Sequence, residues 1–142
     1  MAISLKMLYN TDMLNRHEYR EKIVFTLYQH LLLHKELNRC FEDNFEPEEF
    51  DDYVLAIRDD VNVNKDVYIE EISAYLNKWT FDRLNLVEQA ILLETVSEIK
   101  QGLNDKAVVI DEAVILAKEY CDEEAYKYIN GVLDNICSSS LP

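Results

Sequence analysis

The chain has 142 residues and a formal net charge of −14, with only two glycines and two prolines. So few turn residues exclude a sandwich or barrel and predict an all-α domain of long helices. Its three cysteines are odd in number and widely spaced, which argues against a disulfide framework or a zinc site.

The charge is unevenly distributed along the chain. Residues 1–39 carry six Lys/Arg and four Asp/Glu, whereas residues 40–142 carry eight and twenty-four. Because salt screens charges over about 8–10 Å, a local basic patch near the N-terminus can act despite distant acids. The sequence contains neither a signal-peptide pattern nor a long uncharged apolar run. We therefore expect a cytoplasmic protein without a membrane segment.

The pattern predicts one helical domain over residues 14–137, with an extension over 1–13 and a frayed tail over 138–142. Met13 is a plausible alternative start, because the organised pattern begins directly after it. Apolar residues recur at helical spacing from Leu14 to His34.

Residues 37–49 are acidic and poorly periodic, and a short helix is predicted from Phe50 to Ile57. Asn64 then serves as the N-cap of a further helix over residues 65–78, whose inner face carries Trp79 at its end.

The most apolar stretch, residues 84–99, lacks a polar face wide enough for a surface helix. We predict a central buried helix near residues 82–101, capped by Thr80 and ended at Gly102. Asp111 and Asp122 are the predicted N-caps of the last two helices.

Catalysis has little support in this sequence. Two isolated glycines cannot form a phosphate-cradling loop, and the helix containing His17-Glu18 lacks the second histidine of a zinc protease. His30 and His34 are four residues apart but have no evident third ligand. We therefore expect no enzyme activity, no cofactor and no metal.

Three segments resemble the NusB family of bacterial antitermination factors. They are IDEAVILAKEY followed by YKYINGVLDNI, then Trp79-x-x-x-Arg83-Leu84 with LVEQAIL, and at the front Arg20-Glu21 followed by Leu27-Tyr28-Gln29. Their order and spacing agree with the family over residues 14–137.

This resemblance implies about seven helices in two packed sub-bundles and a binding function without catalysis. Members bind the single-stranded boxA element of RNA together with NusE, a small-subunit ribosomal protein. They join the elongating RNA polymerase complex through other antitermination factors and promote ribosomal RNA transcription.

Family roles transfer onto specific positions. The arginine-rich first helix is similar to the segment with Arg16, Arg20 and Lys22, which would contact RNA together with Tyr28. The start of the last helix would complete the RNA surface through Glu124, Lys127 and Tyr128, with Tyr128 stacking on a base. Glu88, expected at an exposed margin of the central helix, is the candidate NusE contact.

This first helix carries fewer arginines than the first helix of the family usually does, because glutamates and His17 stand among its basic residues. Since each lost phosphate contact lowers affinity, we predict weak RNA binding without NusE. Two alternatives remain open. The chain could be the RNA-guiding helical domain of a ribosomal RNA cytosine methyltransferase, if it is a fragment. It could also be a protein-interaction module that has lost RNA binding.

Overall fold

The computed structural model describes residues 14–139, which form helices and no strands. The α-helices are α2 (Arg16–Leu33), α3 (Leu37–Asn44), α4 (Asp52–Ser73), α5 (Leu86–Gln101), α6 (Lys106–Tyr120) and α7 (Glu123–Ser139). Two 3₁₀ turns, η1 (Pro47–Glu49) and η2 (Phe81–Arg83), precede α4 and α5. The predicted extension over residues 1–13 lies outside the described residues. Helix α7 continues two residues into the segment predicted as tail.

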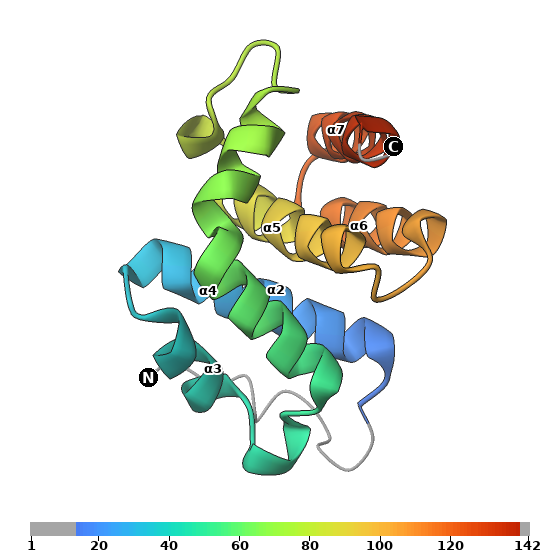
Figure 1. Cartoon of the computed structure of the whole chain (residues 1–142). Helices are drawn as coiled ribbons and strands as arrows, with labels where there is room; N and C mark the ends of the chain where they lie inside the picture. The colour runs from blue at the N-terminus through green and yellow to red at the C-terminus, as the bar shows by residue number, and fades with distance from the viewer. Residues whose placement is uncertain (1–13, 140–142) are drawn as a thin grey trace.

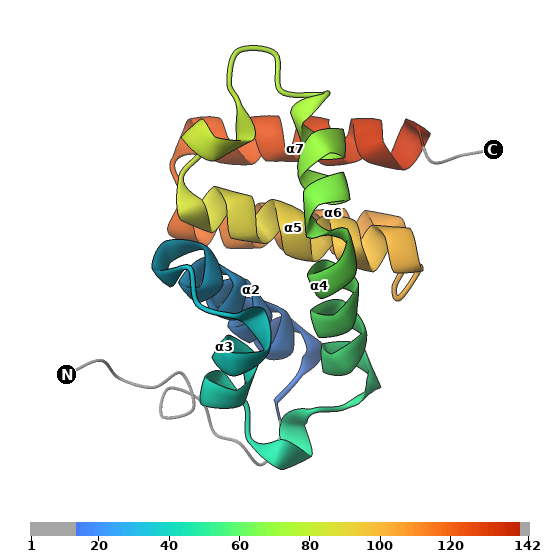
Figure 2. The ribbon, with the colours of Figure 1, turned by 60° about the vertical axis from the view of Figure 1, so that its left-hand side comes forward.

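The helices form two groups joined at α5 (Figure 1). Helices α2 and α3 pack together with the first half of α4, and α5, α6 and α7 pack together on the other side. Helix α4 spans both groups and crosses α5 and α7 steeply (Figure 2). The all-α fold in two sub-bundles is therefore confirmed.

Helix α5 is the buried centre that its sequence predicts. It contacts α2, α4, α6 and α7, and every residue from Glu88 to Ile99 is buried. A helix surrounded on all sides needs apolar residues all round, which explains the missing polar face. Gly102 ends α5 in a left-handed conformation with φ 65°, as expected for a helix C-terminus.

Two helices differ from the prediction. Residues 37–44 form the helix α3, and α4 is continuous where a break before Asn64 was predicted. Asn64 donates from within the helix to Asp60 Oδ1 (2.8 Å), and Asp51 is the N-cap, accepting from the Val54 N–H (2.9 Å). Buried residues lie on both sides of Asn64, at Val61 and Tyr68, so tertiary packing outweighs the weak helix propensity of Asp and Asn.

Of the four predicted N-caps (Asn64, Thr80, Asp111 and Asp122), one is correct. Asp122 caps α7 by accepting from the Ala125 N–H (3.0 Å). Helix α5 is capped by Asn85, because Thr80 instead begins η2, and α6 is capped by Asp105 rather than Asp111. Each helix thus begins at the nearest Asx residue that precedes its first buried turn.

Candidate nucleic-acid interface

Arg20, predicted to contact RNA, is buried and only 2% exposed. Its guanidinium binds Glu98 of α5 with two hydrogen bonds, Nε to Oε2 (2.6 Å) and Nη2 to Oε1 (2.9 Å). Arg20 lies on the same face of α2 as Ile23 and Leu27, and this face packs against α5. This burial argues against the predicted RNA contact, because Arg20 joins two helices in the structure.

A second carboxyl group completes this buried network. Glu94 Oε1 accepts a hydrogen bond from the Tyr53 hydroxyl (3.0 Å) and lies 4.0 Å from Arg20 Nε. Complete burial, together with the nearby negative charge of Glu98, raises the pKa of Glu94 well above its ordinary value. Burial also acts to raise the pKa of Glu98, but hydrogen bonds from Glu94 and Arg20 outweigh it and lower this pKa to about 2. These shifts favour a network of one cation, one anion and one neutral acid.

Replacing Glu94 by Gln tests this protonation state. A raised folded-state pKa stabilises the protein below the ordinary value of 4.5, and this stabilisation is lost as pH rises. We expect the parent to lose up to about 1.4 kcal/mol of unfolding free energy per pH unit from this group above about pH 5. Glu94→Gln keeps the neutral shape, so urea unfolding between pH 5 and 8 should show a shallower decline. An unchanged slope would contradict a protonated Glu94.

Lys22 is also buried, with no exposed surface. Its Nζ lies 3.0 Å from both carboxylate oxygens of Glu49 in η1 and 4.7 Å from the centre of the Phe45 ring. A cation that is completely buried cannot contact a phosphate in the folded protein. Burial therefore argues against the predicted RNA contact of Lys22, as it does for Arg20.

Two predicted residues of α2 retain accessible surface. Arg16 is exposed at the first turn, with its guanidinium carbon 3.7 Å from the centre of the Tyr53 ring. Tyr28 is half-buried against the core near the other end of the helix. Arg16 and Tyr28 are twelve positions apart, about 18 Å along the helix, so they do not form one local patch.

The predicted residues of α7 lie together with Glu88. The Tyr128 hydroxyl donates to Glu88 Oε1 (2.6 Å), and Glu124 and Lys127 are exposed on the same turns of α7. Burial and the Glu88 carboxylate both raise the pKa of Tyr128, so its hydroxyl stays protonated. Glu88 is only 8% exposed, and its predicted place at an exposed margin is wrong. Its carboxylate instead holds the Tyr128 ring in position.

Two hollows flank Tyr128, with volumes of about 460 and 260 Å³. Both are lined by Trp79, Glu124 and Tyr128; Lys78 and Gly131 line the larger, Arg83 and Glu88 the smaller. We call this region the Tyr128 surface: Lys78, Trp79, Arg83, Glu88, Glu124, Lys127 and Tyr128.

Trp79 was not predicted as a site residue from the sequence, and neither were Lys78 and Arg83 of the same surface. Trp79 was assigned to the inner face of a helix, but α4 ends at Ser73 and Trp79 is 57% exposed in the segment before η2. Its polar neighbours in the sequence, Asn77, Lys78 and Thr80, could have indicated that Trp79 is exposed. An exposed tryptophan flanked by cations is suited to stacking on a ligand.

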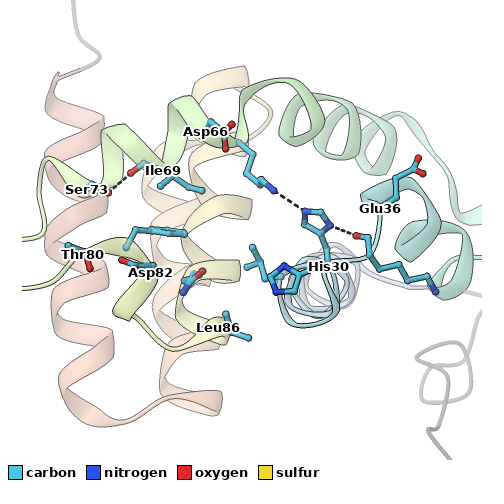
Figure 3. Close-up of a pocket in the computed structure, with 14 residues that line it drawn as sticks. His30, Glu36, Asp66, Ile69, Ser73, Thr80, Asp82 and Leu86 are labelled. Atoms are coloured by element: carbon cyan, nitrogen blue, oxygen red, sulfur yellow. Dashed lines mark hydrogen bonds between the residues drawn. The ribbon is translucent and has the colours of Figure 1, made fainter.

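A separate and larger cavity of about 750 Å³ lies between the end of α2, α4, η2 and the start of α5 (Figure 3). His30 is fixed there, with Nδ1 bonded to the Lys35 carbonyl and Nε2 accepting from Lys65 Nζ (3.1 Å). Burial lowers the pKa of His30, which keeps the ring neutral near pH 7. With both nitrogens engaged, the His30–His34 pair does not form a metal clamp.

Comparison with known proteins places the chain in a family. The sequence profile of the NusB family matches residues 11–138. The chain belongs to the NusB family. It is 38% identical over 125 residues to the transcription antitermination protein NusB of Oceanobacillus iheyensis, covering 87% of this chain and 98% of that protein. The Listeria innocua protein is also 38% identical over 125 residues, covering 87% and 96%.

Solved NusB structures have the same fold. T. maritima NusB superposes with a TM-score of 0.82 and 27% identity, covering 91% of this chain and 94% of that one. A structure of antitermination factors NusB and NusE in complex with double-stranded RNA gives a TM-score of 0.75 at 25% identity, covering 87% and 96%. Antitermination factors of the NusB family therefore include a NusB that assembles with NusE and RNA.

The motifs that carry the family resemblance fall mainly on helices around the Tyr128 surface. The segment IDEAVILAKEY lies on α6, YKYINGVLDNI on α7 and LVEQAIL on α5, while Trp79 and Arg83 lie just before α5. Of the helices described, none has the length and apolarity needed to cross a membrane.

Proposed function

We propose that this NusB-family protein binds boxA-type single-stranded RNA together with a NusE-type ribosomal protein. The complex then joins elongating RNA polymerase through other antitermination factors and promotes ribosomal RNA transcription. Family membership supports this proposal, as does the similar NusB that is found with NusE and RNA. The curated relatives are antitermination proteins rather than methyltransferases, which favours this function over the methyltransferase alternative.

The observation that carries the proposal is the fixed ring of Tyr128 between two hollows. Its hydroxyl is tied to Glu88, so the ring loses little further freedom when a base stacks on it. Trp79 offers a second aromatic face, and the exposed Lys78, Arg83 and Lys127 supply positive charge nearby. Unpaired bases on aromatic rings with cations beside them are the usual elements of single-stranded RNA recognition.

The proposed RNA surface differs from the sequence-based one. Arg20 and Lys22 leave it, because both are buried in ion pairs. Tyr128, Lys127 and Glu124 form its centre, while Arg16 and Tyr28 remain more distant candidates. Tyr128 binds Glu88 and Arg20 binds Glu98, and these two glutamates are about 15 Å apart along α5. Arg16 lies one turn beyond Arg20, so one RNA segment would have to extend well past Tyr128 to reach it.

Glu88 stays in the proposal as a NusE contact, reached through the smaller hollow that it lines. NusE also accounts for how so acidic a chain binds RNA. A net charge of −14 repels RNA at long range, so a partner that supplies cations should raise affinity strongly.

Two variants of Tyr128 test the stacking surface. Tyr128→Ala removes the ring and should weaken boxA RNA binding in the presence of NusE by about 1–3 kcal/mol. Tyr128→Phe keeps the ring and loses only the hydrogen bond to Glu88, so it should retain most of the affinity. Fluorescence anisotropy with labelled RNA gives both values. Equal RNA affinity of the Ala variant and the parent would refute the Tyr128 surface.

A further inference from the structure

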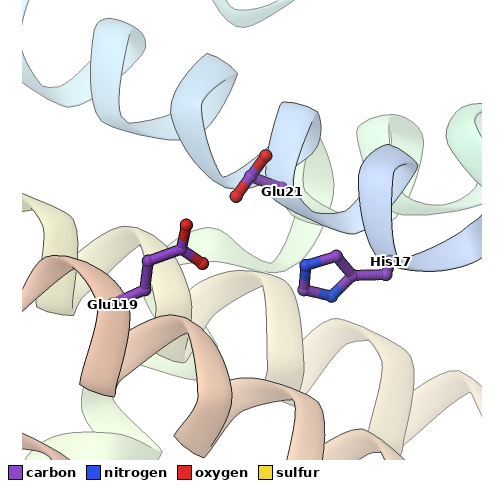
Figure 4. A group of neighbouring side chains, drawn as sticks. All are labelled: His17, Glu21 and Glu119. Atoms are coloured by element: carbon purple, nitrogen blue, oxygen red, sulfur yellow. The ribbon is translucent and has the colours of Figure 1, made fainter. Parts of the chain in front are cut away.

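Three potential metal ligands meet where α2 lies beside α6. Within residues 14–139, one group of three such side chains brings its ligand atoms within 4.8 Å of one another: His17, Glu21 and Glu119 (Figure 4). His17 and Glu21 are four residues apart on one face of α2, and Glu119 faces them from α6. The sequence alone could not pair them, because Glu119 follows His17 by about a hundred residues.

Groups outside this trio already orient two of its members. His17 Nδ1 lies 2.8 Å from Glu112 Oε2, and Glu112 is itself 3.7 Å from Arg20 of the buried network. The Tyr120 hydroxyl donates to Glu21 Oε2 (2.7 Å), and the Tyr120 ring packs edge-on against Phe25 at 4.8 Å. Histidine held through one nitrogen by a carboxylate, with its other nitrogen directed at the ion, is the usual arrangement around protein-bound metals.

We propose that His17 Nε2 and the carboxylates of Glu21 and Glu119 bind a divalent first-row transition ion, with Zn²⁺ as its representative. One imidazole with two carboxylates suits Zn²⁺, whereas Mg²⁺ and Ca²⁺ prefer oxygen ligands alone. The trio lies at the surface, where water can complete the coordination. A bound ion also offsets the repulsion between two carboxylates held close together.

The consequence of such a site is a metal link between the two sub-bundles. Helix α2 belongs to the first group and α6 to the second, and their side chains meet at this polar seam. An ion that binds only the folded arrangement stabilises it by mass action. We therefore expect Zn²⁺ to raise the midpoint of thermal unfolding, while Mg²⁺ leaves it unchanged. The three proposed ligands are not among the residues of the Tyr128 surface.

The test is calorimetric titration of the full chain with Zn²⁺ under reducing conditions, alongside thermal unfolding. The parent should bind one equivalent. His17→Asn and Glu119→Gln should each lower the affinity at least tenfold, as loss of even an outer contact costs about 10–100-fold. Glu119 is exposed, so its variant keeps the fold even if the His17 variant does not. His34→Asn is the matched control, because this exposed histidine is remote from the trio and Asn tolerates its left-handed backbone (φ 54°).

Three results would overturn the proposal. The first is the absence of saturable Zn²⁺ binding by the parent. The second is unchanged affinity in both the His17 and the Glu119 variants. The third is an intense thiolate-to-metal absorption band when Co²⁺ replaces Zn²⁺, because that band would assign the ion to Cys40, Cys121 or Cys137. Weak visible Co²⁺ bands without the thiolate band, lost in His17→Asn, would support the site.

Discussion

Arg20→Ala should destabilise the fold by about 3–5 kcal/mol, the cost of leaving the buried Glu98 without its cation. Both side chains are almost completely buried, so water cannot replace the lost hydrogen bonds. Urea unfolding at pH 7, followed by circular dichroism, measures this change. RNA affinity, measured under conditions where the variant remains folded, should change far less than stability.

Two controls distinguish the loss of stability caused by breaking the buried ion pair from that caused by removing any positive charge. Arg16→Ala removes an exposed cation that stacks on Tyr53, and it should cost about 0.5–1 kcal/mol. Replacing Arg20 by Met together with Glu98 by Leu removes both charges at once and should recover much of the lost stability. A stable Arg20→Ala variant with a large loss of RNA affinity would contradict the burial of Arg20 and restore it to the RNA surface.

Lys22→Ala should have a cost of similar size, about 3–5 kcal/mol, because Glu49 would remain buried without its partner. The lost Lys22 contact with Phe45 adds to this cost. The midpoint of urea unfolding should therefore fall sharply, with little change in the slope.

Lys78→Ala is the matched control for Lys22, since Lys78 is exposed at the Tyr128 surface. Its stability should stay within about 0.5 kcal/mol of the parent, while its RNA affinity in the presence of NusE should fall. The reverse pattern, with Lys22 affecting only RNA binding and Lys78 only stability, would refute the assignment of these two lysines.

The apolar pattern predicted the central helix, because a helix buried on all sides carries apolar residues around its whole circumference. The helix ends at Gly102 and Asp122 were also predicted correctly, because each end depends on a single local residue. The sequence did not predict that α4 is one continuous helix, because the Asp and Asn residues in its middle resemble a break between two helices. Its continuity depends on packing against neighbouring helices on both sides of that middle, at Val61 and at Tyr68.

The cations of α2 could not be placed from sequence for a different reason. A buried cation and an exposed one look alike until the partner is known, and the partners are distant in sequence. Glu98 is 78 residues from Arg20, and Glu49 is 27 residues from Lys22. The pairing of Tyr128 with Glu88 spans 40 residues. Family resemblance identified several residues of the Tyr128 surface, but the tertiary structure was needed to group them with Trp79.

The most direct test of the proposed function is a titration of labelled boxA RNA with the purified protein, with and without its own NusE, at two salt concentrations. We expect saturable, sequence-dependent binding with NusE, and much weaker binding without it. Higher salt should reduce affinity in both cases, because phosphate contacts release counterions. Absence of specific RNA binding under every condition would contradict the account and leave a protein-interaction module that has lost RNA binding.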